Sequence, residues 1–280
     1  MATITTSTAP VETEIFYQDF GTGPPVVLIH GWPLSHRMWE SQVNALTAAG
    51  YRCIAYDRRG FGQTGHATGG YDYDTFAADL NDLMTELDLR DAVLVGFSMG
   101  GGEVVRYLST HGTARVAKAV LAAAVPPYLY KSEDNPDGGL DDATIEQFQL
   151  GVRSDRPAFL EVFATEFFST TGLLGKKLKV SEAQRQHAVS LALPASPKGT
   201  LDCITAFGRT DFRADVAAVT VPTLVIHGDS DAVVPFEVSG KRSAELIPGA
   251  RLHVIEDGPH GINASHAEEF NRVLLEFLAS

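Results

Sequence analysis

The feature that most constrains this chain is a serine enclosed by glycines, Gly96-Phe97-Ser98-Met99-Gly100. A continuous apolar run at residues 92–95 precedes it and is typical of a strand buried on both faces of a sheet. A helical pattern begins soon after it, at Glu103. A turn this tight tolerates little side chain at its flanking positions, which explains the glycines. The sequence therefore predicts a strand–turn–helix unit that lifts the Ser98 hydroxyl clear of the sheet.

Short apolar runs alternate with amphipathic stretches along most of the chain. The further predicted strands are residues 26–29, 52–56, 119–125, 223–226 and 252–255. Apolar residues recur at helical spacing from Phe76 to Leu87 and again from Phe270 to Leu278. Ser265 and Glu268 are spaced as a capping box for this last helix. Such alternation predicts an α/β fold with a mostly parallel, doubly wound sheet.

The alternation breaks at Pro126-Pro127. An Asp- and Gly-rich loop follows, and the pattern is then helical to about Val216, without a convincing buried strand. We therefore predict a helical cap inserted into the sheet domain. The cap comprises residues 127–216, and the core comprises residues 1–126 and 217–280.

Composition excludes several classes of function. The 280 residues are 44% hydrophobic, enough for one substantial core. The formal charge of −13 repels phosphate backbones, so nucleic-acid binding is not expected. No apolar stretch reaches the length of a membrane span, and the Thr-rich start does not resemble a signal peptide. We expect a cytoplasmic protein that does not bind membranes.

Metal and redox sites have no support in the sequence. Neither a C-x-x-C nor an H-E-x-x-H pattern occurs, so no metal is expected. Of the two cysteines, Cys53 sits in a predicted strand and is expected to be a small buried apolar residue.

A serine hydroxyl is a weak nucleophile and needs a base. Among nine histidines, His260 stands out, because it follows the last predicted strand and precedes the last helix. Loops at the carboxyl ends of parallel strands are where such sheets place their sites. We therefore predict that His260 lies beside Ser98.

An acid that orients this base should follow a strand between the serine and the histidine. His227-Gly228-Asp229-Ser230-Asp231 meets this condition and offers two aspartates. Asp57 also follows a strand, but the arginines that come directly after it favour a structural ion pair. The residues alone leave Asp229 and Asp231 as competing candidates.

Two backbone N–H groups are candidates for stabilising negative charge near Ser98. That of Met99 is left unpaired at a helix N-terminus, and that of Trp32 follows the strand at residues 26–29. We expect the substrate pocket to be lined by Trp32, Pro33, Phe97 and Phe163. The other aromatic residues of the cap are expected mainly to pack.

Taken together, these segments resemble the cofactor-free bacterial haloperoxidases, also called perhydrolases or non-haem chloroperoxidases, and their arylesterase and γ-lactamase relatives. The resemblance runs from about residue 13 to the C-terminus. It is carried by residues 30–33 (HGWP), 57–62 (DRRGFG), 71–76 (YDYDTF), 96–102 (GFSMGGG), 227–231 (HGDSD), 234–235 (VP) and 259–261 (PHG).

The resemblance implies an α/β-hydrolase fold with Ser98, Asp231 and His260 as a catalytic triad. In this family the second aspartate of the G-D-x-D turn is the catalytic one, which favours Asp231. Trp32 and Met99 are implied as the oxyanion hole. Small carboxylic esters are the implied substrates, cleaved through an acyl-enzyme, and hydrogen peroxide can replace water to give a peracid without any cofactor.

Other functions of the same fold stay open. A γ-lactamase or amidase is one alternative, and a small-molecule receptor that keeps an intact triad is another. Dehalogenases and epoxide hydrolases are disfavoured, because their nucleophile is an aspartate and this chain has Ser98. A small ester or acyl compound is the expected partner, and a homo-oligomer is an open alternative, since relatives are often oligomeric.

Pro33 carries a further hypothesis. Proline restricts the residue before it to extended geometry, so it helps to fix where the Trp32 carbonyl points. A carbonyl aimed into the site can accept a proton from a hydroperoxide intermediate, which would favour perhydrolysis.

Overall fold

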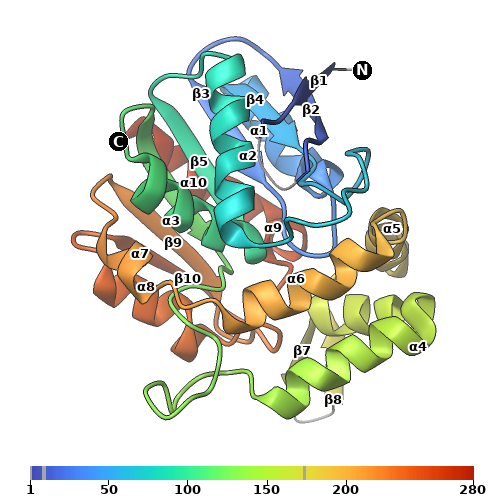
Figure 1. Ribbon diagram of the computed structural model, residues 1–280. Helices are drawn as coiled ribbons and strands as arrows, with labels where there is room; N and C mark the ends of the chain where they lie inside the picture. Colours follow the sequence, from blue (N-terminus) through green and yellow to red (C-terminus); the bar gives the residue numbers. More distant parts are fainter. Residues whose placement is uncertain (1, 8–10, 173–174) are drawn as a thin grey trace.

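The computed structural model describes residues 2–7, 11–172 and 175–280 (Figure 1). Its centre is an eight-stranded sheet in the order β1-β2-β4-β3-β5-β6-β9-β10. From β4 to β10 the neighbouring strands run parallel, whereas β2 pairs antiparallel with β1 and with β4. The strands are β1 (Ala2–Thr5), β2 (Glu14–Phe20), β3 (Pro25–Ile29), β4 (Arg52–Tyr56), β5 (Ala92–Phe97), β6 (Val116–Ala122), β9 (Thr223–Gly228) and β10 (Arg251–Ile255). The predicted fold class is confirmed.

Helices cover both faces of this sheet (Figure 1). α2 packs against α3 on one face, and α1 packs against α10 on the other. The helices of this part are α1 (Glu40–Ala48), α2 (Tyr73–Glu86), α3 (Met99–His111), α8 (Gly240–Leu246), α9 (Ile262–Ser265) and α10 (Ala267–Ala279), with short 3₁₀ turns η1 (His36–Trp39) and η2 (Phe236–Val238). Within the described ranges, no helix has both the length and the apolar composition needed to cross a bilayer.

The central strands are buried on both faces, which is why they are continuously apolar. All six residues of β5 are buried, and Leu94 pairs with Val27 on β3 and with Ala119 on β6. Burying a Val or Leu side chain contributes about 1.5–3 kcal/mol each. The sheet is therefore a rigid base for the loops at its carboxyl end.

The chain between β6 and β9 forms a separate layer over that end of the sheet (Figure 1). It contains α4 (Asp142–Phe167), β7 (Ser169–Gly172), β8 (Gly175–Leu178), α5 (Glu182–Ala192) and α6 (Pro197–Arg209). The last helix of this stretch, α7 (Arg213–Ala217), packs against α3 and α8 of the sheet domain (Figure 1). The β7–β8 hairpin was not predicted, because its four-residue strands are rich in Ser, Thr, Lys and Gly and lack an apolar run. The cap boundaries at residues 127 and 216 stay a prediction.

Helix α4 is two helices joined at a kink. Asp155 has non-helical backbone angles, and Pro157 has no N–H to continue the ladder of hydrogen bonds. The Asp155 carboxylate accepts a hydrogen bond of 3.0 Å from the Ala158 N–H and so caps the second half. The second half of α4 therefore runs in a different direction from the first half, and it ends at Phe167.

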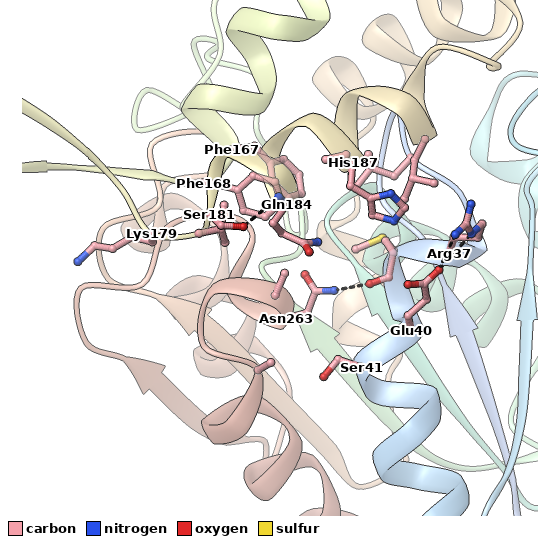
Figure 2. Close-up of a pocket in the computed structure, with 17 residues that line it drawn as sticks. Arg37, Glu40, Ser41, Phe167, Phe168, Lys179, Ser181, Gln184, His187 and Asn263 are labelled. Carbon is pink, nitrogen blue, oxygen red and sulfur yellow. Dashed lines mark hydrogen bonds and ion pairs between the residues drawn. The ribbon is translucent and has the colours of Figure 1, made fainter.

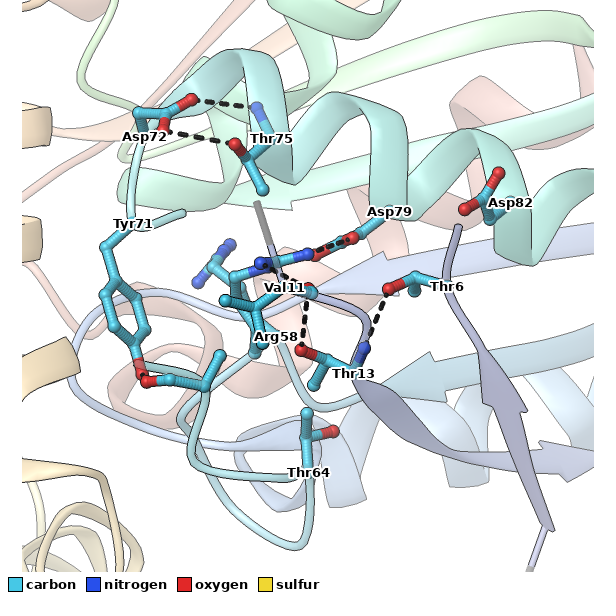
Figure 3. Close-up of polar contacts among 12 residues, drawn as sticks. Thr6, Val11, Thr13, Arg58, Thr64, Tyr71, Asp72, Thr75, Asp79 and Asp82 are labelled. Atoms are coloured by element: carbon cyan, nitrogen blue, oxygen red, sulfur yellow. Dashed lines mark hydrogen bonds and ion pairs between the residues drawn. The ribbon is translucent and has the colours of Figure 1, made fainter. Parts of the chain in front are cut away.

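Two helix starts differ in how they are capped. Asp72 caps α2 by accepting hydrogen bonds from the Thr75 N–H, at 2.9 Å, and from the Thr75 hydroxyl, at 3.1 Å (Figure 3). The predicted capping box of Ser265 and Glu268 is wrong. The chain forms α9 before α10, and the Ser265 hydroxyl donates to the Gly261 carbonyl instead, at 3.0 Å.

The N-terminal strand is joined to the fold by polar contacts. The Thr13 N–H donates to the Thr6 hydroxyl at 3.2 Å (Figure 3). Further on, the Ser7 N–H donates to the Asp82 carboxylate on α2, at 2.8 Å. These contacts hold β1 at the edge of the sheet, away from the carboxyl end where the candidate site lies.

Candidate active site

Ser98 lies in a strained turn between β5 and α3, as predicted. Its φ of 53° is in the left-handed region, which costs about 1–3 kcal/mol for a residue with a side chain. Hydrogen bonds to β6 and the chain after it hold the turn: the Ser98 N–H donates to the Ala122 carbonyl at 2.8 Å, and the Val125 N–H donates to the Ser98 carbonyl at 3.2 Å. The helix begins at Met99, directly after the serine.

Gly96 and Gly100 are required because neighbouring backbone atoms leave no room for a side chain at either position. A Cβ at Gly96 would lie 2.4 Å from the Gly100 carbonyl oxygen. A Cβ at Gly100 would lie 2.5 Å from the Ile29 carbonyl oxygen on β3. These contacts bring the start of α3 against β3 and place the serine at the carboxyl end of the sheet.

The structure brings the three predicted triad residues together. His260 Nε2 lies 2.9 Å from Ser98 Oγ, and His260 Nδ1 lies 2.7 Å from Asp231 Oδ2. The three residues come from the turn after β5, the loop after β9 and the loop after β10. All three are buried, with 6% of Ser98, 5% of Asp231 and 1% of His260 exposed. This arrangement lets the imidazole remove the hydroxyl proton.

Asp231, and not Asp229, reaches the histidine. Asp229 is exposed, and its carboxylate accepts a hydrogen bond of 3.0 Å from the neighbouring Ser230 hydroxyl. Asp231 Oδ1 accepts hydrogen bonds from the N–H groups of Val233, at 2.9 Å, and Val234, at 2.8 Å. These bonds fix the carboxylate so that its other oxygen faces His260.

The charge of Asp231 is stabilised from two sides. Burial alone would raise the pKa of this carboxyl, but the imidazoles of His260 and His227 hold its pKa well below the usual range. His227 Nε2 lies 3.2 Å from Asp231 Oδ2. An ionised Asp231 accepts the Nδ1–H of His260, which leaves Nε2 free to act as a base toward the serine.

The two predicted N–H donors flank the serine. Gly31 makes this approach feasible, because a Cβ there would lie 2.8 Å from the Phe97 ring and 3.1 Å from Ser98 Cβ. In the described part of the chain, neither the Trp32 N–H nor the Met99 N–H donates a hydrogen bond. The Trp32 indole N–H donates to the Thr200 carbonyl on α6 at 3.0 Å, which fixes the ring over the site.

A small apolar cavity lies against Ser98. Its volume is about 20 Å³, room for roughly one water molecule. Apart from the serine, its lining is apolar and comes from both the sheet domain and the layer above it. The lining residues are Trp32, Ser98, Val125, Leu129, Leu140, Phe148, Phe163, Phe207, Val233 and Val234. The serine hydroxyl therefore faces apolar surroundings on this side.

Two of the four predicted pocket residues line this cavity and two do not. Trp32 and Phe163 line it. Pro33 instead lines a neighbouring apolar cavity of about 10 Å³, which shares Phe163 as a wall. Phe97 is fully buried beneath the imidazole, with its ring centroid 5.1 Å from that of His260. That Pro33 and Phe97 contact the substrate stays a prediction.

The remaining lining residues were missed. Phe148 and Phe207 have the helical spacing typical of packing residues, and nothing local distinguishes them from the core. Val233 and Val234 follow Asp231 directly, so their position beside the triad acid is a signal that sequence reasoning could have used.

Asp57 is not part of the site, as predicted. It does not form the predicted ion pair with the arginines that follow it, however. It accepts hydrogen bonds from the His36 N–H, at 2.6 Å, and from the Gln63 N–H, at 2.8 Å. Arg58 pairs with Glu103 at 2.7 Å, and Arg59 pairs with Asp79 at 2.6 Å. The adjacent arginines therefore bind carboxylates on α3 and α2 instead of Asp57.

A second, larger cleft lies between α5 and the segment that contains η1 and α1 (Figure 2). Its volume is about 470 Å³, and its polar lining includes Arg37, Gln184, His187 and Asn263. Phe167 lines this cleft and also contacts His260, so the ring separates the cleft from the triad. None of the triad residues lines it.

The described residues contain no group of three or more His, Cys, Asp or Glu side chains placed to hold a metal ion. Both cysteines are free and buried. Burial raises the pKa of the Cys53 thiol to about 12, and burial also raises the pKa of Cys203. Such thiols are inert at neutral pH, as expected for buried apolar residues.

Comparison with known proteins gives concordant results. The family model of the alpha/beta hydrolase fold matches residues 24–267. A non-heme chloroperoxidase of Kitasatospora aureofaciens is 48% identical over 267 residues, which cover 95% of this chain and 96% of the relative. A bifunctional esterase/perhydrolase of Acinetobacter calcoaceticus is 38% identical over 270 residues, covering 95% and 96%. The crystal structure of a bromoperoxidase from Bacillus anthracis has a TM-score of 0.94 and 57% identity, and the match covers 100% of both chains.

Proposed function

The chain belongs to the α/β-hydrolase family, and we propose that it is a serine hydrolase with Ser98 as nucleophile, His260 as base and Asp231 as the orienting acid. One observation carries this proposal. The Ser98 hydroxyl, the His260 imidazole and the Asp231 carboxylate form an unbroken hydrogen-bonded series, with distances of 2.9 and 2.7 Å. An apolar cavity opens at its serine end.

In the first half of the reaction, His260 takes the Ser98 proton as Oγ attacks the ester carbonyl. The carbonyl oxygen becomes an oxyanion, and the N–H groups of Trp32 and Met99 stabilise it. His260 then gives its proton to the departing alcohol as the carbon–oxygen bond of the ester breaks. The products of this half are the free alcohol and an acyl group on Ser98.

In the second half, water or hydrogen peroxide attacks the acyl group. His260 removes a proton from the attacking molecule and returns it to Ser98 Oγ as the acyl–serine bond breaks. Water gives a carboxylic acid, and hydrogen peroxide gives a peracid. Both outcomes match the relative whose name combines an esterase with a perhydrolase.

The substrates are small carboxylic esters with an apolar acyl group. Trp32 and Phe163 narrow the cavity, and none of the described residues that line it is charged. A charged acyl group would lose its hydration there without gaining a partner. We further propose that the protein is cytoplasmic and that it binds neither nucleic acid nor membranes. Size-exclusion chromatography will decide between a monomer and a homo-oligomer.

The proposal is tested with p-nitrophenyl acetate. Ser98→Ala should abolish turnover, whereas the matched control Ser230→Ala, in the loop of the acid, should keep it. Activity of Ser98→Ala near wild type would show that the nucleophile is another residue. Release of a single equivalent of p-nitrophenol, with the acyl group retained on the protein and no further turnover, would favour the receptor alternative. Faster opening of a bicyclic lactam than of the ester would favour a lactamase.

A further inference from the structure

The imidazole of His30 lies at the end of β3, two residues before Trp32, and is fully buried. The backbone N–H of Arg58 donates to His30 Nε2 at 2.9 Å. A backbone N–H can only donate, so Nε2 is unprotonated and the proton of the neutral ring is on Nδ1. Nδ1 lies 2.9 Å from the Gly31 carbonyl oxygen and donates to it.

This bond sets the orientation of one peptide group. The Gly31 carbonyl and the Trp32 N–H belong to the same planar group and point in opposite directions. The Gly31 carbonyl accepts a second hydrogen bond, from the Leu34 N–H at 3.0 Å. With two donors on its oxygen, this peptide group cannot rotate without losing both bonds, so the Trp32 N–H keeps its direction.

A buried ion pair then connects this loop to the turn that carries the nucleophile. The Arg58 guanidinium donates to the His30 carbonyl at 2.9 Å and to the Glu103 carboxylate at 2.7 Å. Glu103 lies one turn into α3, the helix that begins with Met99. Only 1% of the Arg58 side chain and none of the Glu103 side chain is exposed. The Tyr56 hydroxyl also donates to Glu103.

We propose that His30, Arg58 and Glu103 are positioning residues that hold the Trp32 N–H and the Met99 N–H in the orientation and separation needed to bind one oxyanion. The inference rests on the proposed function, because it assigns these N–H groups to the reaction. None of the three side chains lines the cavity at Ser98. They act through the backbone of the two loops.

The charge state of His30 supports this role. Burial and the neighbouring Arg58 lower the pKa of this imidazole to about 3, although Asp57 and the bond to Gly31 act in the opposite direction. The ring is therefore neutral at neutral pH and keeps the acceptor nitrogen that Arg58 needs. His36, the other titratable group that faces it, also lowers its pKa.

Two His30 variants test the roles of the ring nitrogens Nε2 and Nδ1 separately. In His30→Gln, the amide oxygen can replace Nε2 as acceptor for the Arg58 N–H, but the side chain has a methylene in place of Nδ1 and so loses the donor at that position to the Gly31 carbonyl. In His30→Asn, the shorter amide can still donate to that carbonyl. We expect kcat for p-nitrophenyl acetate to fall roughly ten- to a hundred-fold in His30→Gln with KM nearly unchanged, less than the loss of a whole donor. His30→Asn should recover part of this loss.

The readout specific to positioning is the binding of a boronic acid that adds to Ser98 and mimics the tetrahedral state. Its affinity should fall by the same factor as kcat in His30→Gln, whereas the affinity for a neutral amide analogue of the substrate should not change. The matched control is His253→Gln on β10, where the imidazole contacts Glu269 at 2.7 Å, far along the chain from both loops. It should leave both affinities and kcat unchanged.

Equal loss of affinity for both ligands in His30→Gln, or no loss of kcat, would overturn the inference. If His30→Gln fails to fold, Arg58→Lys tests the same bridge, because one ammonium cannot reproduce the donor geometry of the guanidinium. In that variant, too, the boronic acid should weaken more than the amide. If Ser98→Ala is inactive and the His30 and Arg58 variants behave as wild type, the proposed function stands and only this inference fails.

Discussion

The ring of Phe167 packs edge-on against the imidazole of His260, with centroids 4.8 Å apart and planes at 90°. The Phe167 carbonyl also accepts a hydrogen bond of 2.8 Å from the Gly261 N–H. The last residue of α4 therefore contacts the candidate base through its side chain and the next residue, Gly261, through its backbone. These contacts connect α4, in the layer above the sheet, with the loop that carries His260.

Removing the Phe167 ring should loosen His260. A buried Phe→Ala change destabilises a protein by about 3–5 kcal/mol and would here open space beside the imidazole. We expect Phe167→Ala to lower kcat for p-nitrophenyl acetate at a temperature where the variant is still folded, whereas Phe167→Leu should retain most activity. Equal kcat values for the two variants would show that the ring does not position the base.

The two aspartates of the loop after β9 give a matched pair of variants. Asp231→Asn keeps the size of the side chain but removes the charge that orients and stabilises the imidazole. By analogy with serine proteases, kcat should fall by about 10⁴-fold. Asp229→Asn, on the exposed side of the same turn, should remain near wild type. Steady-state kinetics of both variants check this, and a larger loss in Asp229→Asn would reverse the assignment.

The cavity residue Phe163 should control the length of the acyl group. Phe163→Ala enlarges the space beside Ser98, so longer acyl chains gain apolar contact in the transition state. One methylene in such a pocket changes the rate by roughly 10–200-fold, so the ratio of kcat/KM for butyrate over acetate should rise by at least about tenfold. An unchanged ratio across p-nitrophenyl esters would place the acyl group elsewhere.

Stability at acid pH should depend on His30. Its pKa is lowered from 6.5 to about 3 in the folded protein, so between these values the unfolded chain binds a proton that the folded protein does not. Stability therefore falls as the pH falls through this window, by about 1.4 kcal/mol for each pH unit from this group. His30→Gln removes that contribution. Urea unfolding at pH 6, 5 and 4 should show that the free energies of unfolding of wild type and variant converge as the pH falls. A constant difference between them would contradict the lowered pKa of His30.

The hypothesis on Pro33 is tested by Pro33→Leu. If the proline aims the Trp32 carbonyl at a hydroperoxide intermediate, the ratio of perhydrolysis to hydrolysis should fall in the variant. Acetate plus hydrogen peroxide with a halide-trapping dye reports the first reaction, and p-nitrophenyl acetate reports the second. An unmoved ratio counts against the hypothesis, whatever happens to the absolute rates.

The parts of the site that sequence reasoning found are those that a local pattern specifies. The glycines around Ser98 are required by the turn itself, and His260 is marked by its place after a strand. Position after a strand left both Asp229 and Asp231 as candidates, and the family resemblance favoured Asp231. The mostly parallel sheet was predictable for the same reason, since its strands are continuously apolar where they are buried on both sides.

What escaped prediction depends on contacts between distant segments. Arg58 and Arg59 pair with α3 and α2, not with the neighbouring Asp57, because the fold brings those carboxylates to them. Phe97 and Phe148 are both apolar and aromatic, yet one lies beneath the imidazole and the other lines the cavity. Only the packing of the layers decides between such positions.

The most direct test of the account is to find where the acyl group resides. The protein is mixed with a slowly hydrolysed p-nitrophenyl ester, quenched in acid within the burst of p-nitrophenol release, digested and mapped by mass spectrometry. We predict one acyl group per active chain, on the peptide that contains Ser98, and none in Ser98→Ala. An acyl group on another residue, or a burst in Ser98→Ala equal to that of wild type, would contradict the account.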